Sequence, residues 1–423
     1  MAPCTFAGVG YLARVTEVDA ETAVTPPPRR SLVRTAELGP LARTADDWAK
    51  VLGPLGGRPF HGKQVFRWIH ARSVLDPSQM TDLPASLRQS LQTLGLAETL
   101  TIASERRSTD ATRKLLVKMH DGSTVETVLI PRLPRLGQSK LPSPLDDGAD
   151  DADDTDEEED EANETVHVTQ CISTQVGCAM GCVFCASGVA GLKRQMTADE
   201  IVAQVIVGRS RLEPNEQLRN VVLMGMGEPL HNYDATVRAL KLLTHPDGIA
   251  LSSRRITVST SGLVPEIERL GKDFAGNIGL AISLHATDNE TRSKLMPINR
   301  KYPLEVLMAA LRAYPLPKRR RITIEYTLVA GRNDSTAEAK KLVTLLRGLP
   351  VKVNLIPMNP IEASTLGPPD WNGVFAFQKI VVDAGYSCFI RRQRGDDVSA
   401  ACGQLALSGK WAGAKAKVRV DRS

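Results

Sequence analysis

From about residue 167 onward, strand-like and helix-like segments alternate along this 423-residue chain. Seven short apolar runs, rich in β-branched residues, are expected to form strands. These expected strands are 167–173, 220–224, 256–260, 278–284, 322–329, 351–356 and 387–390. About six βα units of this kind predict an α/β fold with a parallel sheet, either doubly wound or curled into a partial barrel. Functional residues are then expected at the C-terminal ends of the strands.

The segments between these strands have helical patterns. Thr197-Ala-Asp-Glu200 has the spacing of a capping box and is expected to begin the first helix, whose apolar face includes Ile201 and Val205. Further helices are expected at 233–243, 304–313, 336–346 and 374–383.

The chain before residue 167 divides into smaller parts. Apolar residues recur at helical spacing over 45–103, which predicts a small helical module. Residues 104–133 contain two apolar runs around Asp121-Gly122, which predicts a β-hairpin extension. Residues 1–44 are expected to be a disordered tail or an organellar transit segment, 167–407 a catalytic barrel, and 408–423 a basic tail.

Charge is distributed unevenly. Residues 146–164 contain 13 acidic side chains and no Lys or Arg, so we expect 134–166 to form a disordered acidic insert. Removing these 13 acids raises the formal net charge from +5 to +18. The folded body is therefore strongly basic, as in proteins that bind nucleic acids. No run of about 18 apolar residues is present, which excludes a membrane span.

The first expected strand leads into Cys178-Ala-Met-Gly-Cys182-Val-Phe-Cys185. Seven cysteines in a chain of this length do not form a disulfide scaffold. Structural zinc usually has four ligands in paired CxxC units, and no second CxxC occurs here. Three cysteines can hold a [4Fe–4S] cluster and leave one iron open to a substrate. A metal site at Cys178, Cys182 and Cys185 is therefore predicted.

This CxxxCxxC spacing resembles that of radical S-adenosylmethionine (radical SAM) enzymes. The resemblance implies a partial (β/α)₆ barrel, one [4Fe–4S] cluster and SAM bound to its open iron. Gly225-Met-Gly-Glu-Pro229 then resembles the family's motif for the SAM amino group, with Gly227 and Glu228 as ligands. Polar or exposed groups at later strand ends suggest a shared SAM cavity. These candidates are Ser259, Ser283, Leu284, His285 and Asn359.

The resemblance extends to RlmN-type RNA methyltransferases over about residues 45–407. The matching stretches are 125–128, 171–178, 224–229, 259–262, 283–286, 353–357 and 394–405. It implies transfer of a methyl group to C2 of adenosine in rRNA and in some tRNAs. Cys402 would carry the methyl group, Glu126 would remove the C2 proton, and Cys171 would attack Cys402 to release the product with a disulfide. Cys4 and Cys388 match nothing and are expected to be structural.

The same resemblance implies rRNA and tRNA as partners, a flavodoxin- or ferredoxin-like electron donor, no membrane, and a monomer. Arg391, Arg392 and Arg394 are expected to contact RNA phosphates, and the run 318–321 is expected at the opposite end of the barrel as solvated surface. The location is expected to be cytoplasmic, or organellar if 1–44 is a transit peptide. Two alternatives remain: a related C8-adenosine methyltransferase, and a non-catalytic metal-bearing RNA-binding protein.

Overall fold

The computed structural model describes residues 38–96, 100–132, 165–361 and 364–391, together with short pieces at 394–395, 398, 400 and 403–405. The expectations for 1–37, for the acidic run, for Cys4 and Cys402, and for the tail 408–423 lie outside these residues. Within the described part, no helix is long and apolar enough to cross a membrane.

The first described part is helical. It contains α1 (Ala45–Leu52), α2 (Pro59–His70) and α3 (Ala85–Leu94). A capping box begins α1. The hydroxyl of Thr44 accepts a hydrogen bond from the backbone N–H of Asp47, and the carboxylate of Asp47 accepts one from the backbone N–H of Thr44. Trp48 on α1 and Phe66 on α2 are fully buried, and Phe66 packs against His245 (ring centroids 4.7 Å apart). The helical pattern expected over 45–103 therefore ends at Leu94, and a strand begins at Leu100.

Ten strands form one sheet within the described residues, in the order β1-β2-β3-β4-β7-β8-β9-β10-β11-β12. Their bounds are β1 (Leu100–Arg107), β2 (Arg113–Met119), β3 (Thr124–Pro131), β4 (Val166–Cys171), β7 (Glu216–Leu223), β8 (Ile256–Thr260), β9 (Gly279–Ser283), β10 (Ile322–Leu328), β11 (Val351–Pro357) and β12 (Ser387–Ile390). A separate pair is formed by β5 (Gln175–Gly177) and β6 (Leu192–Gln195).

The seven strands from β4 to β12 are parallel and lie in chain order. A doubly wound sheet would reverse its strand order, so the partial (β/α)₆ arrangement is confirmed. Among the described strands β12 pairs only with β11 and β1 only with β2, so the sheet is open rather than a closed barrel.

The expected hairpin is confirmed, with Gly122 in the left-handed region (φ 79°) at its turn. The structure adds β1 to it and joins β3 to β4 in antiparallel register. The hairpin is thus a continuation of the central sheet. Since Arg132 donates its N–H to the carbonyl of His167 (2.8 Å), the two ends of the acidic segment are held together on neighbouring strands.

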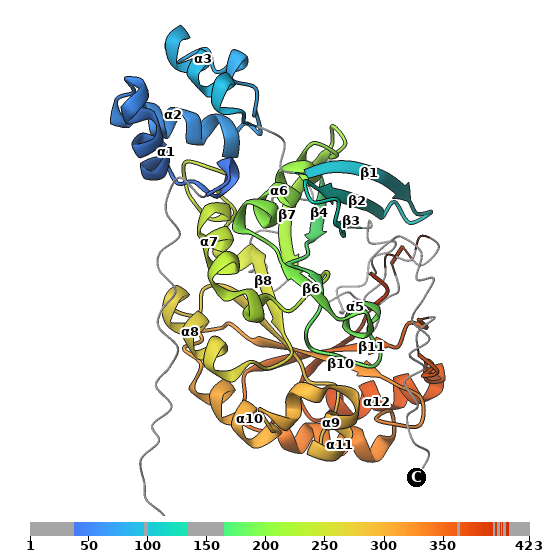
Figure 1. Cartoon of the computed structure of the whole chain (residues 1–423). Helices are drawn as coiled ribbons and strands as arrows, with labels where there is room; N and C mark the ends of the chain where they lie inside the picture. The colour runs from blue at the N-terminus through green and yellow to red at the C-terminus, as the bar shows by residue number, and fades with distance from the viewer. Residues whose placement is uncertain are drawn as a thin grey trace, which may run out of the picture. The chain divides into compact units, whose positions relative to one another are not determined.

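Helices follow the parallel strands, and α8, α10, α11 and α12 lie along one side of β8, β10 and β11 (Figure 1). The bounds are α5 (Ala186–Ala190), α6 (Ala198–Arg209), α7 (Tyr233–Leu243), α8 (Val264–Phe274), α9 (Asn289–Leu295), α10 (Leu304–Ala313), α11 (Thr336–Leu345) and α12 (Trp371–Asp383). The capping box at Thr197 and Glu200 is confirmed. The helices α8 and α9 were not predicted.

The N-terminal helices are attached to α6 by polar contacts. Arg209 donates to the carbonyl oxygens of His70 (2.9 Å) and Ala71 (3.1 Å), and the Asp199 carboxylate accepts from the backbone of Leu41 (2.6 Å). His70 itself is fully buried beside Phe66 (ring centroids 4.3 Å apart). Burial, with a smaller effect of His245, lowers the pKa of His70 to about 3.

This buried histidine predicts a loss of stability in mild acid. The unfolded chain takes up a proton near pH 6.5, whereas the folded chain keeps His70 neutral, so stability falls as the pH drops below 6.5. Urea unfolding at pH 7.5 and 5.5 should show the intact chain losing about 1.4 kcal/mol more than a His70→Leu variant. Parallel losses in the two proteins would contradict the burial of a neutral His70.

Candidate active site

The three cysteines of the CxxxCxxC motif lie on a loop between β5 and α5, beyond the C-terminal end of β4. The loop is tight. Gly181 has a φ of 67°, and a Cβ atom on Gly188 would lie 2.9 Å from the backbone N and O of Cys182. Cys185 is the N-cap of α5 and donates its N–H to the carbonyl of Cys182 (3.3 Å). Local backbone geometry therefore brings the three thiols together.

The environment of these thiols disfavours charge unless a cation is present. Burial raises the pKa of Cys178 to about 12, and the nearby Cys185 and Glu228 add to the shift. Burial likewise raises the pKa of Cys182 well above its usual value, and the two neighbouring thiols act in the same direction. Thiolates at these positions require a positive group bound between them.

One positive charge is supplied by the chain itself. Arg292 on α9 is fully buried, and its charge favours the thiolate of Cys182. Its guanidinium donates to the carbonyl oxygens of Ser261 (2.7 Å), Ser283 (3.1 Å) and Leu284 (3.0 Å). Burial lowers the pKa of Arg292 to about 10, which leaves it charged at neutral pH. Arg292 thus joins the ends of β8 and β9 beside the cysteine loop.

Among the described residues, no three His, Cys, Asp or Glu side chains could hold a single metal ion. The thiols of Cys178 and Cys185 are close enough to raise the pKa of Cys182. Structural zinc usually has four protein ligands, whereas three thiolates can hold a [4Fe–4S] cluster and leave one iron open.

The Gly225–Pro229 loop packs directly against the segment that leads to the cysteines. The carbonyl of Met226 accepts from the backbone of Thr174 (2.8 Å), and the N–H of Met226 donates to the hydroxyl of Ser173 (2.9 Å). Gly227 has a φ of 101°, and a Cβ there would lie 2.5 Å from the side chain of Gln175. Only glycine fits this position without displacing that neighbouring segment.

Glu228 lies in this loop and is 4% exposed. Its carboxylate accepts from the backbone (2.8 Å) and hydroxyl (2.9 Å) of Ser261 and from the backbone of Leu230 (3.1 Å). Burial raises the pKa of Glu228, and the hydrogen bonds from Ser261 oppose that rise. A hydrogen bond from the Thr260 side chain also opposes this rise, so four donors meet the carboxylate, which has about four acceptor positions.

The other candidate SAM ligands lie at the same end of the sheet. Ser259 and Ser283 are half-buried at the ends of β8 and β9, and Asn359 follows β11. Leu284 donates its N–H to the carbonyl of Glu325 (3.0 Å).

His285 is buried in a left-handed conformation (φ 56°). Its Nδ1 accepts from the N–H of Thr327 (2.8 Å), which places the proton of the neutral ring on Nε2. Burial lowers the pKa of His285 to about 3, so the ring stays neutral. It packs edge-on against Phe184 of the cysteine loop (centroids 4.9 Å apart), which places it beside the proposed metal ligands.

Glu126 and Cys171 lie on adjacent strands at this end. The hydroxyl of Ser173 donates to the carbonyl of Glu126 (2.7 Å), and Cys171 pairs with Val128 in register. Both side chains are buried. The Glu126 carboxylate pairs with the ammonium of Lys114 (3.0 Å), which is 11% exposed. The predicted base therefore lies next to the strand that carries the predicted resolving thiol.

Cys402 itself lies outside the described residues, but residues 403–405 are described. Gly403 accepts at its carbonyl from the N–H of Ala186 (2.9 Å), and the carbonyl of Leu405 accepts from the hydroxyl of Ser187 (2.6 Å). Ala186 directly follows Cys185. The chain immediately after Cys402 is therefore bound to the helix that follows the cysteine triplet.

Arg394, for which contact with RNA phosphates stays a prediction, makes contacts within the chain. Its guanidinium pairs with the Asp110 carboxylate (2.8 Å) and donates to the carbonyl of Pro131 (2.9 Å). Gly395 also donates to Asp110 (3.1 Å). These contacts of Arg394 and Gly395 connect the C-terminal segment to the turn between β1 and β2. Arg391 follows β12, and Arg392 lies outside the described residues.

Three residues of the site were missed by sequence reasoning. Ser261, rather than the chosen Ser259, binds Glu228, although both lie in the same matching stretch. Lys114 could have been found from the hairpin register, because it is a diagonal neighbour of Glu126 across β2 and β3. Arg292 had no signal in the sequence, since its partners are carbonyl oxygens from distant segments. Cys388, expected to be structural, is indeed buried in the core.

Comparison with known proteins gives two family matches. Residues 172–343 match the Radical SAM superfamily, and residues 44–96 match the ribosomal RNA large subunit methyltransferase N-terminal domain. A crystal structure of a radical SAM methyltransferase from Sphaerobacter thermophilus superposes with a TM-score of 0.75 at 40% identity, covering 87% of this chain and 99% of that one.

Relatives named dual-specificity RNA methyltransferase RlmN match nearly the full length. The protein from Sorangium cellulosum is 66% identical over 392 residues, 92% of this chain and 99% of its own. The protein from Syntrophobacter fumaroxidans is 42% identical over 360 residues, 85% of this chain and 94% of its own. These matches show that the chain, which contains the cysteine loop described above, is an enzyme and belongs to the RlmN family of radical SAM RNA methyltransferases.

Proposed function

We propose that this RNA methyltransferase transfers a methyl group to C2 of adenosine in rRNA and tRNA. Two observations carry the proposal. Glu126 lies beside the strand that bears Cys171 and leads toward the cysteine loop, and the segment after Cys402 is bound to the helix that follows that loop. C2 of adenine is electron-poor and does not attack the SAM methyl group as a nucleophile. A radical route with a base and two thiols overcomes this limitation.

The residues present fit the two groups that the family uses, a [4Fe–4S] cluster and SAM. Cys178, Cys182 and Cys185 would hold three irons, and a positive group bound between them would lower the raised pKa values of Cys178 and Cys182. Gly227 and Glu228 would bind the amino group of SAM, with Ser259, Ser283, Leu284, His285 and Asn359 around the remainder. When bound, the cluster and SAM together supply a carbon-centred radical by one-electron reduction.

The chain's own residues would perform the other steps. Cys402 would accept a methyl group on its sulfur. After that methyl group has lost one hydrogen atom to the radical, its carbon would join C2 of the RNA base. Glu126 would then remove the proton from C2, and the unpaired electron would return to the cluster. Cys171 would attack the sulfur of Cys402 and break the bond between that sulfur and the transferred carbon; the carbon takes up a proton, which gives methylated RNA and a disulfide between the two cysteines. That disulfide must be reduced before the next turnover.

The partners follow from these roles. A flavodoxin- or ferredoxin-like donor would supply the electron, and the protein would act as a monomer in the cytoplasm, where ribosomes and tRNA are present. The relatives compared are bacterial proteins, and they give no support to an organellar transit segment. The helices of 45–96 would help to bind RNA, as their match to a ribosomal RNA methyltransferase N-terminal domain suggests.

In vitro methylation tests the proposal. Anaerobically reconstituted protein should transfer a deuterated methyl group from SAM to unmodified rRNA and tRNA, and nucleoside mass spectrometry with chromatographic standards should identify 2-methyladenosine. Appearance of 8-methyladenosine instead would assign the chain to the C8 branch. Absence of any transfer by protein with full cluster content would contradict the proposal.

Deletion of the acidic run 146–164 is predicted to leave turnover within about twofold of the intact chain. Its ends are connected by the pairing of β3 with β4, which the deletion leaves in place. Losing 13 negative charges should also tighten non-specific RNA binding at low salt. Filter binding at two salt concentrations measures this effect, and failure of cluster assembly in the deleted protein would show that the run is needed for folding.

The ion pair between Lys114 and Glu126 predicts a second effect. Lys114→Met keeps the length of the side chain but removes the charge that holds the carboxylate in place. Proton removal should slow by about 10-fold or more, because a carboxylate that is no longer held in position loses most of the rate enhancement that correct placement gives. A quenched time course should then show more protein–RNA adduct than in the unaltered enzyme. A matched Lys118→Met change, on an exposed position of the same strand, should have little effect.

A further inference from the structure

A network of side-chain hydrogen bonds connects the Gly225–Pro229 loop to the β5–β6 pair, which leads into the cysteine loop. Gln175, the first residue of β5, is fully buried, and its side-chain oxygen accepts from the backbone N–H of Glu228 (2.8 Å). Its own backbone N–H donates to the carbonyl of Met226 (3.2 Å), and a Cβ on Gly227 would lie 2.5 Å from its side chain. Gln175 therefore contacts three successive residues of the loop.

Two further side chains hold the amide group of Gln175. Its Nε2 donates to Oε1 of Gln195 on β6 (2.8 Å) and lies 3.0 Å from Nδ1 of His231. The Nε2 of Gln195 lies 3.2 Å from the same Nδ1 and donates to the carbonyl of His231 (3.1 Å). His231 belongs to the 3₁₀ turn Pro229–Asn232, which directly follows Glu228. The network therefore begins and ends on the same segment of chain.

The backbone groups at the two ends of the network fix the direction of its hydrogen bonds. The N–H of Glu228 can only donate, so Gln175 presents its oxygen to Glu228 and its Nε2 to the other two side chains. The carbonyl of His231 can only accept, so Gln195 presents its Nε2 to His231. Nδ1 of His231 is then an acceptor, and the proton of the neutral ring is on Nε2. A network in which donors and acceptors are matched in this way favours a single geometry.

The same network is connected to the proposed cluster ligands through the backbone. Gln175 and Gln195 pair in register across β5 and β6. β5 leads directly into Cys178, whose N–H donates to the carbonyl of Gly191 (3.1 Å), next to the start of β6. A displacement of the Gln175 side chain would therefore shift the backbone at Glu228 relative to Cys178.

This relative placement bears directly on the proposed chemistry. SAM would bind the open iron of the cluster and, through its amino group, the loop at Gly227 and Glu228. One small molecule can make both contacts only if the loop and the cysteines keep a fixed separation. Four donors already meet the Glu228 carboxylate, so backbone carbonyl oxygens such as that of Gly227 are the further acceptors that the loop can offer an ammonium group. The position of the loop backbone is what Gln175 controls.

We propose that Gln175, held by Gln195 and His231, is a positioning residue of this enzyme, which keeps the loop that would bind the amino group of SAM in place relative to the cysteine loop. The inference rests on the proposed function, which assigns that amino group to Gly227 and Glu228.

Equilibrium dialysis of two ligands with the full-length, anaerobically reconstituted protein, its cluster oxidised, tests this role. The ligands are SAM and 5′-methylthioadenosine, which has the adenosine and the sulfur of SAM but no amino acid part. Gln175→Leu should weaken SAM binding by about 10-fold or more and 5′-methylthioadenosine binding by about twofold or less, because only SAM has the amino group that the displaced loop would bind. Iron content should stay that of the unaltered protein.

Gln378→Leu is the matched control. Gln378 is also buried and also binds a backbone carbonyl, that of Cys388 (2.9 Å), but it lies on α12. This variant should bind both ligands as the unaltered protein does.

His231 gives a second comparison, which serves if Gln175→Leu does not fold or does not bind iron, because His231 is exposed. His231→Leu removes the acceptor for the two amide groups and should weaken SAM binding by about threefold or more. His231→Asn places an acceptor oxygen near the position of Nδ1 and should restore SAM affinity to within about twofold of the unaltered protein.

The outcomes separate this inference from the proposed function. If the unaltered protein prefers SAM and the Gln175→Leu and His231→Leu variants keep that preference, the positioning role is overturned and the proposed function stands. Equal loss of both ligands in these variants also overturns it, since that loss reflects a general disruption of the site. Equal binding of SAM and 5′-methylthioadenosine by the unaltered protein would instead contradict the assignment of Gly227 and Glu228 to the amino group.

Discussion

Replacement of Cys178, Cys182 or Cys185 by alanine is expected to abolish the absorbance of the iron–sulfur cluster and all cleavage of SAM. Each thiolate would hold a different iron, so an alanine at any of the three positions removes one of the cluster's three protein ligands. Visible absorbance, iron and sulfide analysis, and release of 5′-deoxyadenosine measure the loss.

Cys388→Ala is the matched control. Cys388 is also a buried free thiol, and burial raises its pKa to about 12, but it lies on β12 within the hydrophobic core. This variant should lose some stability, about 1 kcal/mol, and keep its cluster. A triplet variant that retained full iron content and activity would contradict the assignment.

Alanine at Cys402 and alanine at Cys171 are expected to fail at different steps. Cys402→Ala removes the methyl acceptor, so neither methylated RNA nor a covalent complex should form. Cys171→Ala keeps the acceptor and removes the attacking thiol. At most one turnover should occur, and the protein should accumulate covalently bound to RNA. A nuclease-sensitive shift on a denaturing gel measures the adduct.

Glu126→Ala should trap a similar adduct one step earlier, before C2 loses its proton. Mass spectrometry of the nuclease-digested adducts distinguishes the Glu126→Ala adduct from the Cys171→Ala adduct, because the Glu126→Ala adduct keeps one more hydrogen. Normal turnover of Cys171→Ala without an adduct would exclude the two-thiol mechanism for this chain. The backbone contact between Gly403 and Ala186 already brings the segment after Cys402 to the cysteine loop, as the mechanism requires.

The parallel half of the fold could be predicted because its elements are strongly patterned. The expected strand 256–260 and helix 233–243 match β8 and α7 to the residue. Strand β1 was missed because most of its side chains are exposed and show no alternation. The helices α8 and α9 follow short connections after β8 and β9, and α9 has only seven residues, too few for a periodic pattern.

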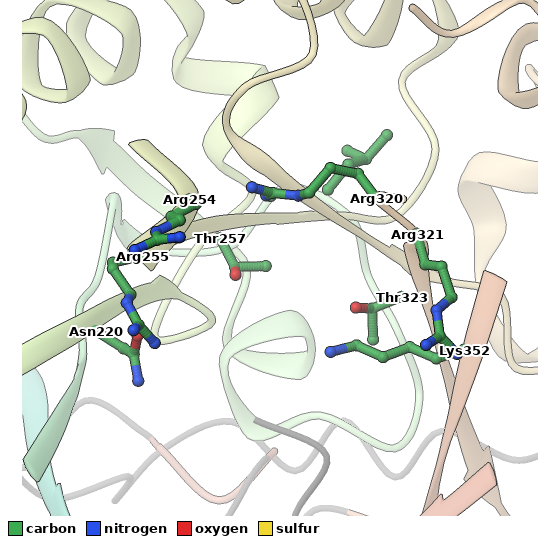
Figure 2. Close-up of a pocket in the computed structure, with 10 residues that line it drawn as sticks. Asn220, Arg254, Arg255, Thr257, Arg320, Arg321, Thr323 and Lys352 are labelled. Atoms are coloured by element: carbon green, nitrogen blue, oxygen red, sulfur yellow. The ribbon is translucent and has the colours of Figure 1, made fainter. Parts of the chain in front are cut away.

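The site was predictable only where residues act as contiguous motifs. The cysteine triplet and the Gly225–Pro229 loop could be found from their spacing. Arg292 could not, because it binds carbonyl oxygens that come together only after β8 and β9 pair. The run 318–321 was expected to be solvated surface, and Lys318, Arg319 and Arg321 are indeed exposed. Arg320 is half-buried, and the sequence does not reveal that it lines a cavity with Arg254 and Lys352 (Figure 2).

The most direct test of the central claim is nucleoside mass spectrometry of rRNA and tRNA from a strain that lacks this protein. We expect 2-methyladenosine to disappear from both RNA classes and to return when the intact chain is expressed, but not when Cys178→Ala is expressed. Unchanged 2-methyladenosine in the deletion strain, or full restoration by Cys178→Ala, would contradict it.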